Sequence, residues 1–125
     1  MVPVKVGIVG CGRIATLVHL PSLTKINKID IVAAVDTNKE RLHETLEKFH
    51  IEEGYDDYRL MLKKADADTV FVCTPPKHHF QIVMDSIKHN KHVFCEKPIA
   101  STVEEALAIK KALEKRNRVC LLYTS

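Results

Sequence analysis

The amino-acid sequence predicts a doubly wound, parallel α/β sheet of six strands in a single domain. Short apolar runs rich in β-branched residues, typical of buried parallel strands, alternate with stretches of helical periodicity. No hairpin signal joins two neighbouring runs, so each strand is expected to reach the next through a helical crossover. The chain has 125 residues, of which 46% are hydrophobic and 28% are charged, and this suits one globular domain.

The predicted strands share an apolar centre and have a turn or cap signal at their ends. They occupy residues 4–9, 31–35, about 54–55, 69–73, 92–95 and 119–122. Crossovers on both faces of such a sheet predict the strand order 3-2-1-4-5-6. Open sheets of this kind bind ligands outside the carboxyl ends of their strands, so polar residues at those ends are the candidates for a site.

Five helices are expected between the strands. They begin at about Arg13 and within residues 37–40, span about 57–64 and 78–89, and begin again within residues 101–104. Both four-residue segments look like capping boxes, with Thr37 and Ser101 as the capping residues.

Three features within these helices can be checked directly. Pro21 should end or kink the first helix. Asn90 lies where a left-handed residue would end the fourth. The last helix is expected to bury four apolar side chains: Val103, Ala106, Ile109 and Leu113.

The loop after the first strand has the pattern G-x-G-x-x-A at Gly10, Gly12 and Ala15. Gly10 allows a tight turn, Gly12 lets backbone N–H groups approach a diphosphate, and Ala15 lets the helix pack on the strand. Asp36 closes the second strand at the spacing of about 20 residues expected of a dinucleotide-binding unit. Its carboxylate can accept hydrogen bonds from a ribose diol. A βαβ unit that binds nothing is the alternative, but such a turn does not need Gly12 and Asp36 together.

Composition and charge narrow the classes of partner. A formal net charge of +3 is too small to argue for nucleic acid, and the lysines and arginines alternate with glutamates as on a solvated helix face. No apolar run approaches the ~20 residues of a membrane span, and the first residues lack the features of a signal peptide. We therefore expect a cytoplasmic protein that binds neither nucleic acid nor membranes.

Four widely spaced cysteines, Cys11, Cys73, Cys95 and Cys120, do not indicate a disulfide framework. The first three lie at or just past predicted strand ends, where they could converge on a ligand, but we prefer to interpret them as core residues. The seven histidines show no ligand spacing around them, so a zinc site is poorly supported and no metal is expected.

Two more motifs follow the fourth and fifth strands: Thr74-Pro75-Pro76-x-x-His79 and Glu96-Lys97-Pro98. Together with the glycine motif, in this order and spacing, they resemble the N-terminal domain of the glucose–fructose oxidoreductase / inositol dehydrogenase / MocA family. The resemblance extends over essentially the whole chain. It implies a Rossmann domain that binds NAD or NADP, and hydride transfer to or from a sugar, polyol or related hydroxyl or carbonyl compound.

The resemblance also implies a set of cofactor-binding residues: Gly10, Cys11, Gly12, Arg13, Ile14, Asp36, Thr74, Pro75, His79, Glu96 and Lys97. The loop from Gly10 to Ile14 would hold the pyrophosphate, and Asp36 would bind the adenosine ribose. The residues after the fourth and fifth strands would lie toward the nicotinamide end. Lys97 would be the catalytic residue, because an ammonium group beside a developing alkoxide stabilises it and can relay a proton.

Plainer interpretations remain open for several of these residues. Lys97 could form a solvent-side pair with Glu96, and His79 could simply be a residue of its helix. His78 matches no family position and should face solvent, and Tyr58 should pack without chemistry.

The choice between NAD and NADP depends on Asp36, because a carboxylate there would repel a 2′-phosphate. This favours NAD. Lys39 and Arg41 could relieve the repulsion, but we prefer to interpret them as solvated helix charges. Pro76 stands where the family often has asparagine, so one polar contact to the cofactor should be missing.

Relatives of this kind continue into a substrate domain that is absent from residues 1–125. We therefore expect these residues to form one dinucleotide-binding domain that binds cofactor but turns over little substrate by itself. Without a partner domain it should expose an apolar patch near the last strand and self-associate, giving a homo-oligomer. The alternative function is a stand-alone, non-catalytic module that binds or senses the nicotinamide nucleotide.

Overall fold

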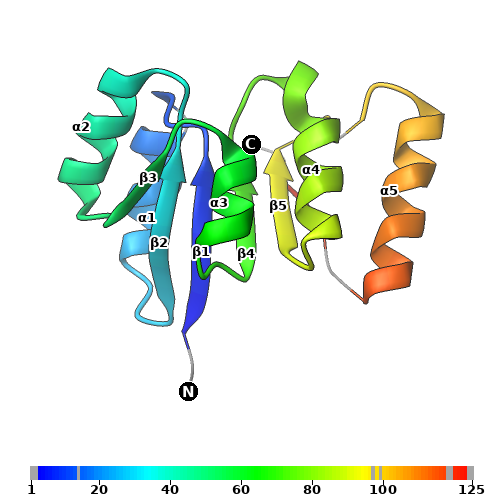
Figure 1. The fold of residues 1–125 in the computed structure, drawn as a ribbon, viewed down its shortest axis with the longest axis horizontal. Helices are drawn as coiled ribbons and strands as arrows, with labels where there is room; N and C mark the ends of the chain where they lie inside the picture. Colours follow the sequence, from blue (N-terminus) through cyan, green and yellow to red (C-terminus); the bar gives the residue numbers. More distant parts are fainter. Residues whose placement is uncertain (1–2, 14, 97, 99, 118–119, 124–125) are drawn as a thin grey trace.

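The computed structural model describes residues 3–13, 15–96, 98, 100–117 and 120–123. In this part of the chain the strands form one parallel sheet in the order β3-β2-β1-β4-β5-β6 (Figure 1). Their bounds are β1 (Val4–Val9), β2 (Ile29–Val35), β3 (Glu53–Tyr55), β4 (Thr69–Val72), β5 (His92–Glu96) and β6 (Cys120–Tyr123). The predicted fold class and strand order are confirmed. Residue 119, predicted to begin the last strand, lies outside the described residues.

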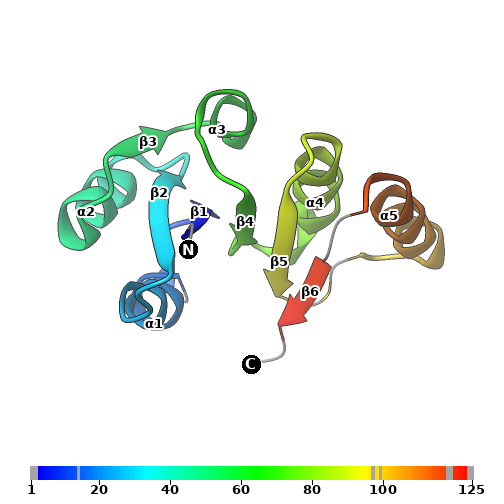
Figure 2. The ribbon, with the colours of Figure 1, turned by 90° about the horizontal axis from the view of Figure 1, so that it is seen from below.

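The helices cover both faces of the sheet. They are a π-helical segment (Ala15–His19), α1 (Leu20–Thr24), α2 (Lys39–Phe49), α3 (Tyr58–Lys64), a 3-10 turn (Pro76–His78), α4 (His79–Lys88) and α5 (Val103–Arg116). The apolar side chains of α1 and α2 pack on one face, and those of α3, α4 and α5 pack on the other. Figure 2 shows α1 on the side of the sheet opposite α4 and α5.

The two core layers meet at the central strand β1. Ile8 is fully buried among side chains from α1 and α2, whereas its neighbour Val9 packs with side chains from α3 and α4. Successive side chains of a strand point to opposite faces, so both Ile8 and Val9 are covered. This packing holds the carboxyl ends of β1, β2 and β4 side by side, and the loops that follow them form one rim.

Pro21 does not end the first helix. The chain is π-helical from Ala15 to His19 and then α-helical from Leu20 to Thr24, with Pro21 in the first turn of the α segment. A proline is tolerated in a first turn, because its missing N–H would have no intrahelical acceptor there. The change of helix type, rather than an end, therefore accommodates this residue.

Both predicted capping boxes are displaced by one residue. Asn38, not Thr37, caps α2, and its side chain accepts a hydrogen bond from the Arg41 backbone N–H. Thr102, not Ser101, caps α5 by accepting from the Glu105 N–H at 3.1 Å. Each helix begins one residue later than expected because the residue before each cap is also a hydrogen-bonding type, and local sequence does not decide between them.

The last helix buries less than predicted. Ile109 is buried, but Val103 is 75% exposed and Ala106 is exposed as well. The reason is that α5 packs beside α4 at the side of the sheet and covers little strand surface (Figure 2).

Asn90 has the expected left-handed backbone, with φ of +61°. No helix in the described ranges is long and apolar enough to cross a membrane.

Candidate functional site

A cavity of about 860 Å³ lies at the carboxyl ends of β1, β2 and β4. Six of the predicted cofactor-binding residues line it: Gly10, Gly12, Arg13, Asp36, Thr74 and Pro75. The remaining wall comes largely from the N-terminal end of α3 and from residues around the start of α4. The topology thus brings loops far apart in the sequence to one cavity at the predicted edge of the sheet.

Gly10 makes the turn out of β1. Its φ is +100°, and its N–H donates a hydrogen bond to the Val35 carbonyl at 2.8 Å. A Cβ at this position would lie 2.9 Å from the backbone carbonyl carbon and oxygen of Cys73. Both the backbone conformation and the contact with β4 therefore require glycine.

Gly12 is different, because the protein's own packing does not explain it. Its φ lies outside the left-handed region, and a Cβ built on it would meet no atom of the described residues within 4 Å. Gly12 lines the large cavity, and its carbonyl accepts hydrogen bonds from the Thr16 N–H and hydroxyl, each at 3.0 Å. Open space beside this glycine is what a backbone that closely approaches a bound diphosphate requires.

Asp36 is 6% exposed, and the described residues give its carboxylate three donors. The Cys11 N–H donates to Oδ2 at 2.9 Å, and the Asn38 N–H donates to Oδ1 at 2.8 Å. The Arg41 guanidinium donates to Oδ1 at 3.1 Å. A carboxylate has about four acceptor positions, so Oδ2 keeps capacity for another donor, such as a hydroxyl.

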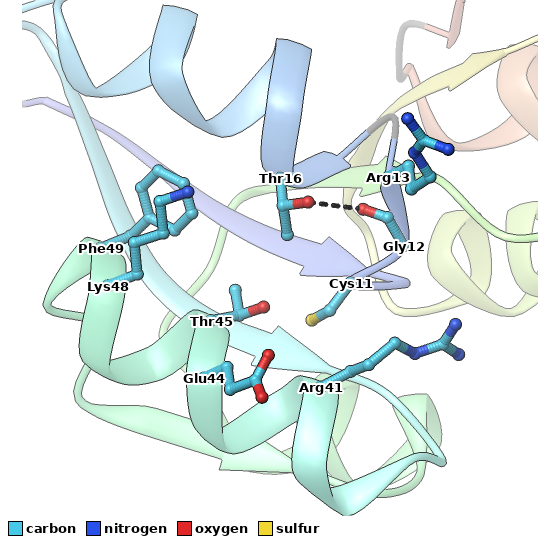
Figure 3. Close-up of a pocket in the computed structure, with 9 residues that line it drawn as sticks. All are labelled: Cys11, Gly12, Arg13, Thr16, Arg41, Glu44, Thr45, Lys48 and Phe49. Carbon is cyan, nitrogen blue, oxygen red and sulfur yellow. Dashed lines mark hydrogen bonds between the residues drawn. The ribbon is translucent and has the colours of Figure 1, made fainter.

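Arg41 was interpreted as a solvated helix charge, and this was wrong in part. Its side chain is 54% exposed, yet it forms an ion pair with Asp36, which has a buried carboxylate. Arg41 lines the large cavity and also a second pocket of about 240 Å³ between the glycine loop and α2 (Figure 3). The negative charge of Asp36 is therefore partly neutralised before any ligand binds.

Cys11 faces this smaller pocket, with its thiol pointing toward Thr45 (Figure 3). Burial raises the pKa of Cys11 to about 11, and the negative charge of Asp36 adds to the shift while the hydrogen bond with Thr45 opposes it. The thiol is therefore neutral near pH 7 and a poor nucleophile. The predicted core placement is confirmed for Cys11 and Cys95, whereas Cys73 is half-buried and lines the large cavity.

Thr74 lines the cavity and has a hydroxyl group without a hydrogen-bond partner in the described part of the chain. Its Oγ1 is buried and has no hydrogen-bond partner among the residues that the structure describes. Leaving a buried hydroxyl unpaired costs about 1–3 kcal/mol, so such groups in native proteins usually have a partner. A ligand in the cavity that Thr74 lines can supply one.

His79 does not line the cavity; it is 2% exposed and lies behind the wall. Its Nδ1 is 2.8 Å from the Pro98 carbonyl oxygen, and its Nε2 is 2.6 Å from the Thr74 carbonyl oxygen. Its neighbour His78 is exposed, as expected, and forms part of the cavity wall. The cavity wall therefore contains the exposed His78 and not the buried His79.

The N-terminal end of α3 contributes to the cavity wall, which the sequence did not predict. Asp57 caps this helix, and Tyr58 and Arg59 join it in the cavity wall. The Tyr58 hydroxyl donates to the Asp85 carboxylate on α4, and burial together with this bond raises the pKa of Tyr58. Tyr58 packs as expected, but its place at the site depends on a contact 27 residues away in the chain, which no local signal reveals.

Three of the predicted site residues lie wholly or partly outside the described part of the chain. Ile14 and Lys97 lie outside the described residues, and Glu96 is described only as the end of β5. Their roles remain predictions. Within the described ranges, no group of three or more His, Cys, Asp or Glu side chains is placed to hold a metal ion.

Known proteins with this sequence pattern share the fold. Residues 4–124 match the family model of the GFO_IDH_MocA oxidoreductase family, NAD-binding Rossmann fold. The chain is 35% identical over 96 residues to myo-inositol 2-dehydrogenase of Thermotoga maritima, covering 77% of this chain and 28% of that protein. It is 31% identical over 117 residues to D-glucoside 3-dehydrogenase of Escherichia coli, covering 94% of this chain and 33% of that protein.

A solved structure supports the same assignment. The scyllo-inositol dehydrogenase of Lactobacillus casei, crystallised with NAD(H) and scyllo-inositol, superposes with a TM-score of 0.90 at 30% identity. The match covers 96% of this chain and 36% of that one, so the chain spans about a third of the length of such relatives. The chain belongs to the glucose–fructose oxidoreductase / inositol dehydrogenase / MocA family of oxidoreductases, and it is a NAD-binding Rossmann domain of that family.

Proposed function

We propose that this chain binds NAD in the large cavity and forms the cofactor-binding part of an oxidoreductase that acts on a sugar, polyol or related compound. The observation that carries the proposal is the open space beside Gly12, since nothing within the described protein requires glycine there. The unpaired hydroxyl of Thr74 on the same wall is a second indication of a ligand.

The glycine loop would hold the diphosphate. Gly10 turns the chain out of β1, and the N–H groups of the residues after it, predicted to be Cys11 to Ile14, would face phosphate oxygens near the start of a helix. The Cys11 N–H is already used by Asp36, so the amides of Gly12 and Arg13 are the better candidates. Ile14 completes the set as a prediction.

Asp36 would bind the adenosine ribose through the remaining capacity of Oδ2. This arrangement suits NAD, because a 2′-phosphate would lie against a carboxylate. The ion pair with Arg41 weakens that argument, since it places a cation beside the same carboxylate. We therefore propose NAD as the preferred cofactor, with NADP also able to bind.

The rest of the dinucleotide would cross the switch point between β1 and β4 and lie along the loops after β4 and β5. Thr74 and Pro75 line the cavity in that direction, and Glu96 and Lys97 follow β5 in sequence. When bound, the nicotinamide supplies a hydride acceptor or donor. Lys97 would stabilise charge on the substrate oxygen and relay its proton.

Turnover would need residues beyond these. The chain spans about a third of the length of its relatives, and the polyol and sugar specificity of those enzymes applies here only by analogy. We propose that the chain binds cofactor but turns over little or no substrate alone, that it is cytoplasmic, and that it self-associates. A non-catalytic nucleotide sensor is the alternative.

Calorimetric titration of the chain with NAD, NADH and NADP tests the proposal. Saturable binding of NAD that is tighter than that of NADP is expected. An absence of binding to all three would refute it. Enzyme-like oxidation of myo-inositol or glucosides by the chain alone would contradict the claim that turnover needs further residues.

A further inference from the structure

The side chain of His79 joins the two loops that follow β4 and β5. It is the first residue of α4, and both of its ring nitrogens face backbone carbonyl oxygens. Thr74 comes just after β4, and Pro98 comes just after β5. Because β4 and β5 are paired in the sheet, the ring spans the gap between their carboxyl ends.

In both contacts the ring of His79 acts as a hydrogen-bond donor to the backbone. It does not act as a residue that binds the cofactor. Carbonyl oxygens only accept hydrogen bonds, so each contact requires an N–H of the ring, and the two N–H groups are present together only in the imidazolium form. At 2% exposure, the ring offers no surface to the cavity. Loss of the ring would take a hydrogen-bond donor from both carbonyls, and this favours keeping the two loops at the separation that the ring sets.

We infer that His79 is a positioning residue: its ring ties the loop of Thr74 to the loop of Pro98 and so holds the nicotinamide side of the cavity without touching the cofactor. The inference builds on the proposed function. Pro98 is the residue directly after Lys97 in the sequence, so the contact reaches the motif that contains the predicted catalytic residue. Asp36, which would bind the adenosine ribose, is not a partner of the His79 ring.

Three substitutions separate the two contacts. His79→Phe keeps a ring but removes both donors. His79→Asn places an amide N–H₂ near the position of Nδ1, so it can keep the Pro98 contact alone. His79→Gln places the amide near the position of Nε2, so it can keep the Thr74 contact alone. His89→Phe, at the other end of α4 and exposed, is the matched control.

Each variant is titrated with NADH and with ADP, which carries the adenosine half and a diphosphate but no nicotinamide. We expect His79→Phe and His79→Gln to weaken NADH binding by about five- to tenfold, the effect of one lost hydrogen bond, and to leave ADP binding unchanged. His79→Asn should bind NADH more tightly than His79→Gln. His89→Phe should match the wild type with both ligands. Thermal unfolding confirms that each variant is folded.

The outcomes are distinct. Unchanged NADH binding in His79→Phe overturns the inference, as does an equal loss of NADH and ADP binding, which would indicate a role in the fold as a whole. Weaker NADH binding in His79→Asn than in His79→Gln overturns the role of the Pro98 contact. A wild-type chain that binds neither ligand refutes the proposed function itself, before any variant is compared.

Discussion

Replacing Gly12 by alanine is the sharpest test of the site, because the same change at Gly10 provides an opposite control. At Gly12 a new methyl group would enter open space beside the cavity, with a backbone φ that alanine can adopt. At Gly10 the methyl group would lie 2.9 Å from the Cys73 carbonyl, at a φ of +100°. One substitution should therefore affect binding, and the other should affect folding.

The magnitudes follow from these environments. Gly12→Ala should leave stability unchanged or raise it by up to about 1 kcal/mol, because alanine restricts the unfolded chain. Gly10→Ala should cost roughly 2–5 kcal/mol, from the unfavourable φ and the steric overlap. For a diphosphate held by backbone N–H groups, losing one charge-assisted hydrogen bond costs about 1.5–3 kcal/mol, so Gly12→Ala should weaken NAD binding about ten- to hundredfold.

Thermal unfolding and calorimetry measure the two effects separately. We expect Gly12→Ala to unfold at the wild-type temperature but to bind NAD weakly. We expect Gly10→Ala to unfold at a temperature lower by about 10 °C or more. Wild-type NAD affinity in a folded Gly12→Ala variant would refute the argument that a ligand, and not the protein, requires this glycine.

Further predictions concern Arg41, Thr74 and Cys11. Arg41→Ala leaves the Asp36 carboxylate without its cation. Calorimetry should therefore show that NADP binding is weakened about tenfold more than NAD binding. An equal change in both affinities would contradict the role of the ion pair in cofactor choice. Thr74→Val removes a buried hydroxyl that has no partner among the described residues. The melting temperature should therefore stay the same or rise, while the affinity for NADH should fall several-fold. A loss of stability with unchanged affinity would argue against a ligand contact. The pKa of Cys11 is raised to about 11, so its neutral thiol favours the folded state. Stability should be full below the ordinary pKa of a thiol, 9.0, and should fall by roughly 2–3 kcal/mol as pH rises through 11. Urea unfolding should show a smaller decline in Cys11→Ala, and identical pH profiles would contradict this.

Much of the fold could be predicted from the sequence because its signals are local. Period and composition identified the strands and helices in order, and the lack of hairpin turns identified a parallel sheet. The first residue of a helix could not be predicted in the same way. Asn38 and Thr102 cap their helices next to residues that could also have done so, and the choice depends on packing.

The site was predictable where backbone geometry defines it. Gly10, Gly12 and Asp36 follow strand ends, and a doubly wound sheet brings such ends together. Residues whose roles depend on side-chain partners were not predictable. The hydrogen bond of Tyr58 with Asp85 and the burial of His79 both arise from contacts that a linear pattern does not contain.

The strand order and the loop that can hold a diphosphate follow from local sequence, because hydrophobic periodicity and glycine placement act within a few residues of the chain. Which side chains meet depends on the folded chain. His79 faces the carbonyl of Pro98, 19 residues away, and Thr74, which lines the cavity, has a buried hydroxyl without a partner among the described residues. Such contacts depend on how helices settle against the sheet, and that is set by the packing of the whole core.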